Sequence, residues 1–152
     1  MGTDIHTYVE VRREGKWELE TRLVFEADPY MRERYGAVGG SRPFNWRSYA
    51  MFGVLAHVRR NDGPCIAKPR GWPDDVSPAL EAMRDEIEHT PSYLTLAELV
   101  AFDYDQPWTP YPDEPQCNTV RIVLGTRFFE DLEVLKQLGD PKDVRMVFFF
   151  DS

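Results

Sequence analysis

The chain has 152 residues, of which 42% are hydrophobic and 13% aromatic, which excludes a disordered protein and fits one domain with a sizeable core. The net charge of −8 excludes general affinity for nucleic acid or an anionic membrane, because each phosphate contact needs a Lys or Arg. No apolar run approaches the roughly twenty residues of a membrane span, and Asp4 and His6 stand where a signal peptide needs a basic flank. With only two cysteines, in unrelated contexts, we expect reduced thiols in a cytoplasmic protein.

The opening stretch, residues 4–12, alternates with the period of a β-strand. One predicted face is mainly apolar and carries Ile5, Thr7, Val9 and Val11. The other face is polar and carries Asp4, His6, Tyr8 and Glu10. For Tyr8 and Glu10, exposure of this strand face to solvent explains the polar residue types equally well as a functional site does. Asp4 and His6 stand where the sheet meets its loops, so we predict the rim of a site there.

The next segments predict a hairpin, a long loop and a buried helix. Residues 17–19 return antiparallel after a turn at 14–16, and residues 23–25 are candidates to extend the sheet. Residues 28–42 mix glycines and a proline with tyrosines and arginines, which predicts a mobile flap. A tolerated surface insertion is the competing interpretation.

A helix capped by Asn45 is predicted over residues 46–59, with so little polar face that it must be buried. Arg59 suits the negative end of its dipole. Arg47 would stand at the positive end, where a cation is disfavoured, so we expect Arg47 to contact a ligand.

The remaining chain predicts short helices, an ordered coil and a closing strand. Ser77 is the expected cap of a helix that begins at Pro78, and Thr95 with Glu98 forms a capping box for residues 96–102. Residues 120–124 fit a short strand or the approach to a helix, and residues 128–138 fit the last helix. Residues 144–150 are apolar on both faces, which is typical of a central strand. If that strand pairs with the opening one, Asp151 lies near the N-terminus. The expected fold is therefore α+β, with a small antiparallel or mixed sheet that pairs the N-terminal hairpin with the C-terminal strand, several short helices and long ordered loops.

Three kinds of chemistry are open to these residues. A divalent metal is one, with Asp4, His6 and His89 as ligands and a further carboxylate from Asp74, Asp75, Asp103 or Asp151. Covalent catalysis is another, through Ser92 with His89 or Cys65 with His57, although no nucleophile elbow or phosphate-binding loop motif occurs. An anion pocket is the third, since guanidinium groups bind phosphates and aromatic rings stack on bases. Its arginines would be Arg32, Arg34, Arg47, Arg59 and Arg70, unless they only pair with the many carboxylates.

Several segments together resemble an uncharacterised family of small bacteriophage proteins. They are the opening Met-Gly-x-Asp-Ile-His-x-x-Val-Glu, the segments 47–59, 70–77 and 89–96, and the closing Val-Arg-x-Val-Phe-x-Phe-Asp that ends at Asp151. The chain departs from the family pattern at Thr3, Ser48, His57 and Pro91, and the departure at Pro91 weakens a metal site built on its segment. The resemblance implies a phage protein acting in a bacterial cytosol, a setting in which small proteins sequester nucleotide-like immune signals.

We therefore predict a non-catalytic, homo-oligomeric protein that binds a small anionic or nucleotide-like ligand without a cofactor. The expected ligand-binding residues are Asp4, His6, Arg47, Tyr49, Arg59, Arg70, Asp74, His89, Ser92 and Tyr93. One alternative is a metal-dependent hydrolase of such a ligand, with the metal on Asp4, His6 and His89. Another is an inhibitor that binds a host protein through its aromatic loops.

Overall fold

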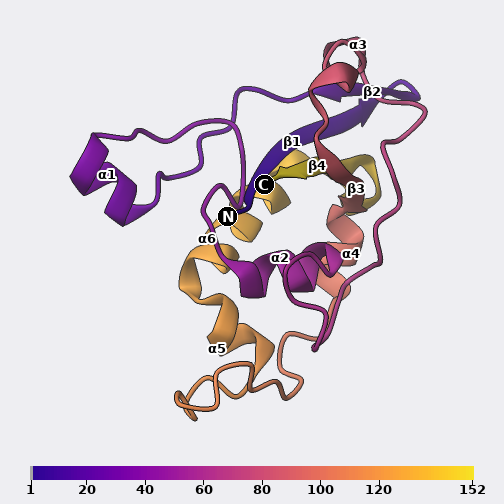
Figure 1. The fold of residues 1–152 in the computed structure, drawn as a ribbon. Coiled ribbons are helices and arrows are strands. Elements are labelled where there is room, and N and C mark those ends of the chain that lie inside the picture. The colour runs from indigo at the N-terminus through magenta and orange to yellow at the C-terminus, as the bar shows by residue number, and fades with distance from the viewer. Residues whose placement is uncertain (1) are drawn as a thin grey trace.

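The computed structural model describes residues 2–152 as a four-stranded antiparallel sheet with helices on both faces (Figure 1). The strands are β1 (Asp4–Arg13), β2 (Lys16–Leu19), β3 (His89–Thr95) and β4 (Val144–Asp151), in the spatial order β2-β1-β4-β3. The helices are α1 (Pro29–Tyr35), α2 (Tyr49–Ala56), α3 (Pro78–Glu81), α4 (Leu96–Ala101), α5 (Val120–Leu124) and α6 (Thr126–Leu135). The α+β class is confirmed, and so is the pairing of the N-terminal hairpin with the C-terminal strand. No helix in the described part of the chain is long and apolar enough to cross a membrane.

Strand β4 is central because both of its faces are apolar. Val144 to Phe150 are all buried, and the strand lies between β1 and β3. Its register with β1 pairs Asp4 with Asp151 and Glu10 with Arg145. The start of β1 and the end of β4 therefore lie side by side, as the sequence predicts.

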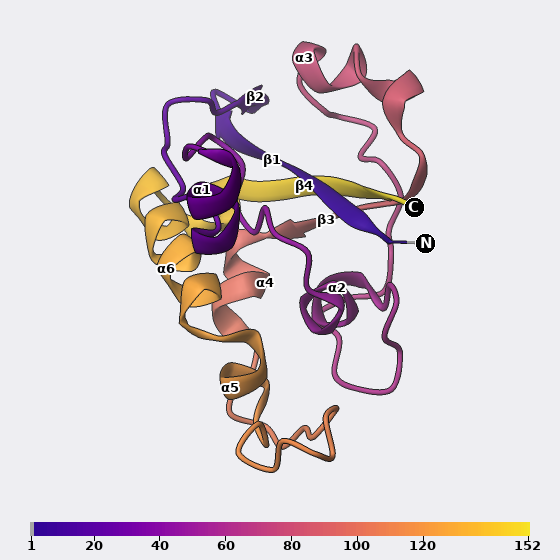
Figure 2. The ribbon, with the colours of Figure 1, turned by 60° about the vertical axis from the view of Figure 1, so that its left-hand side comes forward.

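The two faces of the sheet bury different residues (Figure 2). The face that carries Val9 and Phe148 packs against α2, α4, α5 and α6 in the larger core. The opposite face carries Tyr8 and Phe149, and Leu80 of α3 packs on it in a smaller core. Tyr8 and Glu10 are both buried there, so the solvated-face interpretation of these two residues is wrong.

Helix α2 is shorter than the sequence predicts. Ser48, not Asn45, caps it, and the Ser48 Oγ accepts a hydrogen bond from the Met51 amide at 3.2 Å. Asn45 instead donates to the Arg42 carbonyl. The helix ends at Ala56 because His57 adopts a left-handed backbone with φ 57°. Both predicted ends were therefore wrong, although the helix is buried as expected.

Some of the other predicted helix boundaries are confirmed and others are wrong. The capping box of Thr95 and Glu98 is confirmed at the start of α4. The expected Ser77 cap makes no side-chain hydrogen bond, and α3 stops at Glu81 before a 3-10 turn over Arg84–Glu86. Residues 120–124, left open between strand and helix, form α5, whose cap is Thr119.

The expected flap is partly helical. Helix α1 lies inside it, and an isolated bridge between Phe25 and Gly40 closes its base, so residues 23–25 do not extend the main sheet. We call residues 26–39 the arm. Strand β3 was not predicted, because its start is interrupted by Pro91 and by Thr90, which has φ 51° and lies at a register shift.

Candidate functional site

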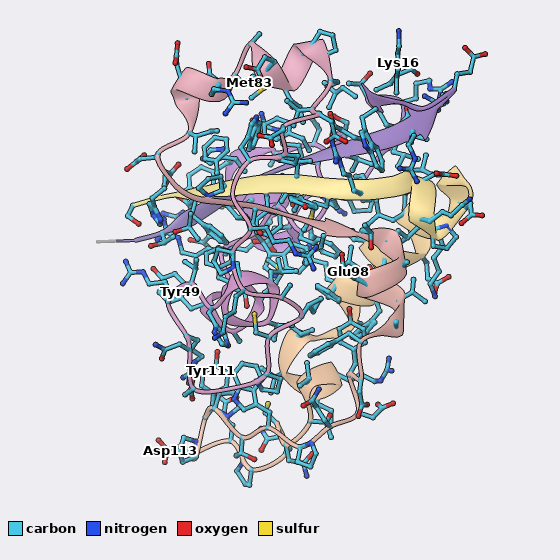
Figure 3. All side chains as sticks on the ribbon, turned by 90° about the vertical axis from the view of Figure 1, so that its right-hand side faces the viewer. Lys16, Tyr49, Met83, Glu98, Tyr111 and Asp113 are labelled. Atoms are coloured by element: carbon cyan, nitrogen blue, oxygen red, sulfur yellow. The ribbon has the colours of Figure 1, made fainter. Side chains whose placement is uncertain are left out.

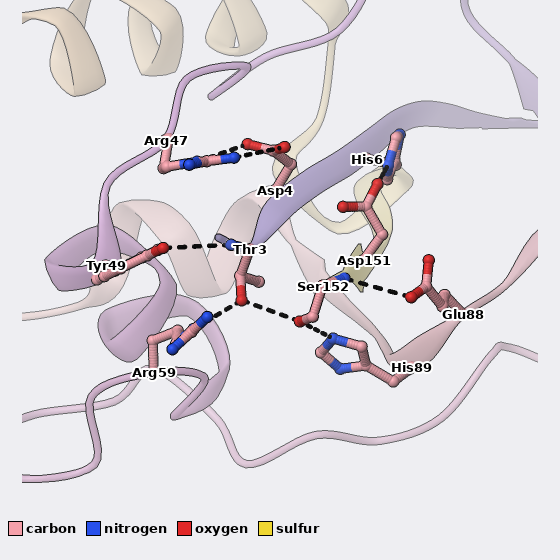
Figure 4. A network of polar contacts seen from close by, with 10 residues as sticks. All are labelled: Thr3, Asp4, His6, Arg47, Tyr49, Arg59, Glu88, His89, Asp151 and Ser152. Atoms are coloured by element: carbon pink, nitrogen blue, oxygen red, sulfur yellow. Dashed lines mark hydrogen bonds and ion pairs between the residues drawn. The ribbon is translucent and has the colours of Figure 1, made fainter. Parts of the chain in front are cut away.

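A polar cluster gathers where β1 and β3 begin and β4 ends (Figure 4). We call it the terminal cluster, and its members are Thr3, Asp4, His6, Arg47, Tyr49, Arg59, Glu88, His89, Asp151 and Ser152. The antiparallel register brings the strand ends together, and α2 with its flanking residues supplies the arginines and the tyrosine. Asp4, His6, Arg47, Tyr49, Arg59 and His89, which the sequence singles out, are thus brought to one end of the sheet.

Arg47 and Asp4 form a bidentate ion pair. The Arg47 Nε and Nη2 donate to the two carboxylate oxygens of Asp4, each at 2.9 Å. This hydrogen bonding lowers the pKa of Asp4 and raises the pKa of Arg47. Arg47 precedes the Ser48 cap and lies outside the helix, so the predicted conflict with the helix dipole does not arise. Both side chains of the pair are about half-exposed to solvent.

The two histidines of the cluster have separate partners. His6 Nε2 lies 2.5 Å from Asp151 Oδ2, and its ring stacks on Phe149 at a centroid distance of 4.9 Å. His89 Nε2 lies 2.8 Å from the Ser152 Oγ. Within residues 2–152 no three His, Cys, Asp or Glu side chains are grouped as metal ligands, and Asp4, His6 and His89 each engage a different group.

Buried Thr3 connects the cluster to α2. Its amide donates to the Tyr49 hydroxyl at 3.2 Å, and its hydroxyl oxygen accepts from the Arg59 Nε at 2.6 Å. The same hydroxyl lies 2.9 Å from the Ser152 Oγ. Thr3 therefore holds both Tyr49 and Arg59 in place, a role that the sequence did not reveal.

Tyr49 and Arg59 also line a depression of about 380 Å³, which we call the arginine–tyrosine depression. Its walls are Tyr49, Arg59, Arg60, Asn61, Asp62 and Tyr111. The Arg59 guanidinium lies 4.9 Å from the centre of the Tyr49 ring, and the Arg60 guanidinium lies 5.0 Å from that of Tyr111. Tyr49 and Tyr111 lie on the same side of the molecule (Figure 3). Two cation–aromatic pairs thus face one hollow.

The backbone around the two arginines is strained and close-packed. Arg59 has φ 63°, in the left-handed region that costs a side-chain-bearing residue on the order of 1 kcal/mol. Gly53 allows the backbone of Arg60 to approach α2 closely, because a Cβ at position 53 would lie 2.6 Å from the Arg60 carbonyl oxygen. Arg60 is fixed by Asp62 at 2.9 Å and by the Pro110 carbonyl at 3.1 Å. Arg60 and Tyr111 are not predicted from the sequence, since nothing local indicates that the coil at residue 111 returns to the end of α2.

Three of the predicted ligand residues lie together along β3, apart from the terminal cluster. The Ser92 Oγ accepts from the Arg70 amide, and the Arg70 guanidinium lies 5.2 Å from the centre of the Tyr93 ring. Arg70 also binds both carboxylate oxygens of Glu98 and lowers the pKa of Glu98 to about 2. These contacts attach the loop at Arg70 to β3 and α4. Asp74, in a nearby turn, is exposed and joins neither group.

The pairs proposed for covalent catalysis are not assembled. Ser92 is fully buried and accepts from the Arg70 amide, whereas the two ring nitrogens of His89 lie on the hydroxyls of Thr90 and Ser152. Burial raises the pKa of the Cys65 thiol, which donates to the Ala67 carbonyl at 3.0 Å and meets the backbone of His57, while the His57 ring Nε2 lies 3.4 Å from the Gly63 carbonyl oxygen. Neither side chain has the environment of an activated nucleophile.

A second depression, of about 400 Å³, lies on the α3 side of the terminal cluster. It is lined by His6, Tyr8, Arg42, Met83, Glu86, Glu88, Phe149 and Asp151. Its carboxylates outnumber its arginine, so it suits an anionic ligand less well than the arginine–tyrosine depression does.

Comparisons of the chain with protein-family models, with curated proteins and with solved structures find no match. The resemblance to a phage family therefore stays a prediction.

Proposed function

We propose that the protein binds a small anionic, nucleotide-like ligand in the arginine–tyrosine depression. The observation that supports this is the convergence of Arg59 on Tyr49 and Arg60 on Tyr111 around a single hollow of about 380 Å³. Ligand pockets in proteins span roughly 300–1,000 Å³. The hollow therefore has room for a ligand at the small end of that range.

The lining residues match the parts of a nucleotide. Guanidinium groups bind phosphate through paired N–H donors, and aromatic faces stack on bases. Asn61 and Asp62 add polar atoms suited to ribose hydroxyls. Since the protein carries a net charge of −8, a local pair of arginines favours one selected anion over general binding of polyanions.

In this proposal the terminal cluster supports ligand binding in two ways: it positions Tyr49 and Arg59, and it supplies the half-exposed Arg47. Thr3 links the Tyr49 hydroxyl and Arg59 to the strand ends, which reduces the entropy lost when a ligand binds. The half-exposed Arg47 is available to a second phosphate if the ligand displaces Asp4. In this proposal Arg70, Ser92 and Tyr93 have a structural role instead, and the exposed Asp74 takes no part in binding.

The biological role that we attach to this site comes from the resemblance. We propose a phage protein that sequesters a nucleotide-like immune signal in the host cytosol and works as a homo-oligomer. A metal-dependent hydrolase that uses Asp4, His6 and His89 is the alternative, and its support is that these three residues share one end of the sheet. Turnover of the bound nucleotide that stops when a chelator is added would favour the hydrolase.

The first test identifies and then perturbs the ligand. Mass spectrometry of the protein purified from bacterial cytosol detects a co-purifying nucleotide, and calorimetry with a panel of purine mono- and dinucleotides measures affinity. Arg60→Ala removes a charged donor and is expected to weaken binding about ten- to a hundredfold. Tyr111→Ala removes a stacking face and is expected to weaken it by a similar factor.

The matched control is Arg84→Ala, which removes an exposed arginine paired with Glu81 on the α3 side. Arg84→Ala changes the net charge of the protein by the same amount as Arg60→Ala does, but Arg84 lies outside the arginine–tyrosine depression. Equal affinities for Arg60→Ala and Arg84→Ala would contradict the proposed site.

A further inference from the structure

The arm is fixed at its base and carries a helix away from the body. Phe25 and Gly40 exchange two backbone hydrogen bonds, of 2.7 and 3.0 Å. A Cβ on Gly39 would lie 2.4 Å from the Phe25 carbonyl oxygen, so the closure needs glycine there. Arg127 of α6 donates to the Ala27 carbonyl at 2.7 Å. These contacts fix the base of the arm to the body of the protein. Helix α1 projects from that fixed base (Figures 1 and 2).

Helix α1 lacks the packing that normally stabilises a helix of its length. It has seven residues and none of them is buried. Isolated helices shorter than about 12–15 residues are marginal in water, and helices in proteins depend on burying one face. Within residues 2–152, five of the seven strongly exposed large apolar side chains lie on the arm or next to it: Val24, Tyr30, Met31, Tyr35 and Val38. Such a concentration marks an interaction surface.

A groove with mainly apolar walls lies elsewhere on the same chain. It has a volume of about 590 Å³ and lies between α5 and α6. Its walls are Arg121, Ile122, Gly125, Thr126, Phe129, Glu130 and Glu133. Ile122, 48% exposed, is another of the strongly exposed apolar residues. Both views show α1 standing apart from α5, and although the base of the arm reaches α6 through Arg127, no hydrogen bond, ion pair or ring contact within residues 2–152 joins α1 itself to the walls of the groove (Figures 1 and 2).

We infer that the arm of one copy docks in the α5–α6 groove of a second copy, and that the reciprocal contact closes a two-fold dimer. Among the described residues, the arm carries one cation and the groove one carboxylate that form no ion pair, while Asp28 and Glu33 of the arm are further unpaired carboxylates that this contact leaves in solvent. Within residues 2–152, the Arg34 guanidinium contacts the hydroxyl of Tyr35, at 3.3 Å, and the ring of the same residue, and pairs with no carboxylate. Glu130, on the rim of the groove, has neither a hydrogen bond nor an ion pair within the described residues. Docking pairs Arg34 with Glu130 while the tyrosines cover Ile122 and Phe129.

The size of the contact fits a reversible dimer. Covering Tyr30 and Tyr35 in both copies, together with the groove walls that they touch, removes on the order of 1,000 Å² from water. That area is at the lower end for a specific interface, so we expect a micromolar dissociation constant. In the reciprocal arrangement the same contact forms twice, so no arm or groove stays unoccupied. Further copies therefore cannot add to the dimer to form a fibre.

Sedimentation velocity over a concentration series from low micromolar to several hundred micromolar tests the dimer. The wild-type protein is expected to pass from monomer to dimer across the series. Tyr35→Ser on the arm and Ile122→Lys in the groove are each expected to weaken dimerisation at least tenfold. Val100→Ser is the control, because Val100 is 42% exposed on α4 and belongs to neither surface.

A charge exchange tests the register directly. Arg34→Glu and Glu130→Arg are each expected to weaken the dimer, and the double variant is expected to restore it. A wild-type chain that stays monomeric throughout would overturn the inference and leave the arm to a different protein. A dimer that withstands Ile122→Lys would overturn it too, since the arm would then pair with another surface. The arginine–tyrosine depression shares no residue with the arm or the groove, so nucleotide binding that survives Tyr35→Ser separates this inference from the proposed function.

Discussion

Two arginine–carboxylate pairs, whose carboxylates project from the same face of β1, differ in how completely the chain covers them. Glu10 and Arg145 lie 2.7 Å apart, with side chains 0% and 5% exposed. Asp4 and Arg47 lie 2.9 Å apart, and each side chain is about half-exposed. The first pair is enclosed by the hairpin and by the segment that leads into α3, whereas the second lies at the uncovered end of the sheet. We therefore expect the covered pair to contribute more to the stability of the fold than the exposed pair does.

The buried pair attaches the segment before α3 to the sheet. The Glu10 carboxylate accepts from the Arg145 Nε at 2.8 Å and from the Ser77 amide at 2.7 Å. Arg145 also donates to Asp75 at 2.9 Å and lies 4.0 Å from the centre of the Trp17 ring. Because its donors and acceptors are satisfied, the buried charge is tolerated. Within the described residues the Asp4 carboxylate has Arg47 as its hydrogen-bond partner, and the pair stays accessible to solvent.

The largest expected effect comes from breaking the buried pair. Glu10→Ala leaves Arg145 without its enclosed carboxylate and the Ser77 amide without an acceptor. Removing one partner of a buried ion pair costs about 3–5 kcal/mol, so we expect a loss of that size in the free energy of unfolding. Urea unfolding monitored by tryptophan fluorescence measures it. A loss below about 1 kcal/mol would show that Asp75 alone neutralises Arg145.

The sequence predicted the frame of the sheet for a definite reason. Apolar residues on both faces of 144–150 require a central strand, and the alternation in 4–12 supplies its neighbour. Strand β3 was missed because propensity is read locally, while Pro91 and the left-handed Thr90 interrupt the pattern at its start. The end of α2 was missed for a related reason. His57 takes a conformation that its residue type does not favour, and only the tertiary contacts around it select that conformation.

The candidate site was predicted in part. Pairing of the terminal strands follows from their hydrophobic patterns, so the meeting of Asp4, His6 and Asp151 could be expected. Arg60 and Tyr111 could not, because they are about fifty positions apart and the coil between them carries no periodicity. Arg70 and Ser92 were placed in the site by residue type alone. The structure assigns both of them to the attachment of a loop to β3.

Asp131 is a buried carboxylate that forms no ion pair within the described residues, although the Arg127 charge nearby partly offsets the effect of its burial. Asp131 is buried, and its side chain accepts a hydrogen bond from the Phe44 amide at 2.8 Å. Burial raises the pKa of Asp131 from 3.8 to about 6. The folded protein therefore holds a proton that the unfolded chain loses near pH 4, and stability falls as the pH rises from about 4 through about 6.

Asp131→Asn keeps an acceptor for the Phe44 amide and removes the ionisation. The variant is expected to lose this part of the pH dependence and to gain on the order of 2 kcal/mol at pH 8 relative to the wild type. Unfolding curves at pH 5 and pH 8 measure the difference. If the two proteins keep parallel stability profiles over that range, the raised pKa of Asp131 is contradicted.

The smallest effect is expected at the uncovered pair. Hydrogen bonding from Arg47 lowers the pKa of Asp4, so the stability that the pair contributes is present above the ordinary pKa of 3.8 and is lost as the pH falls through the lowered value. Asp4→Asn is expected to cost about 0.2–1 kcal/mol at neutral pH and low salt, and almost nothing in about 1 M salt, where screening acts over about 3 Å. The cost of Glu10→Ala should barely change with salt, because its pair is enclosed. Unfolding of both variants at the two salt concentrations therefore measures the comparison directly. A salt-independent loss above about 2 kcal/mol for Asp4→Asn would show that the sheet end is held together as firmly as the buried pair, and would remove the reason to expect Arg47 to exchange Asp4 for a ligand.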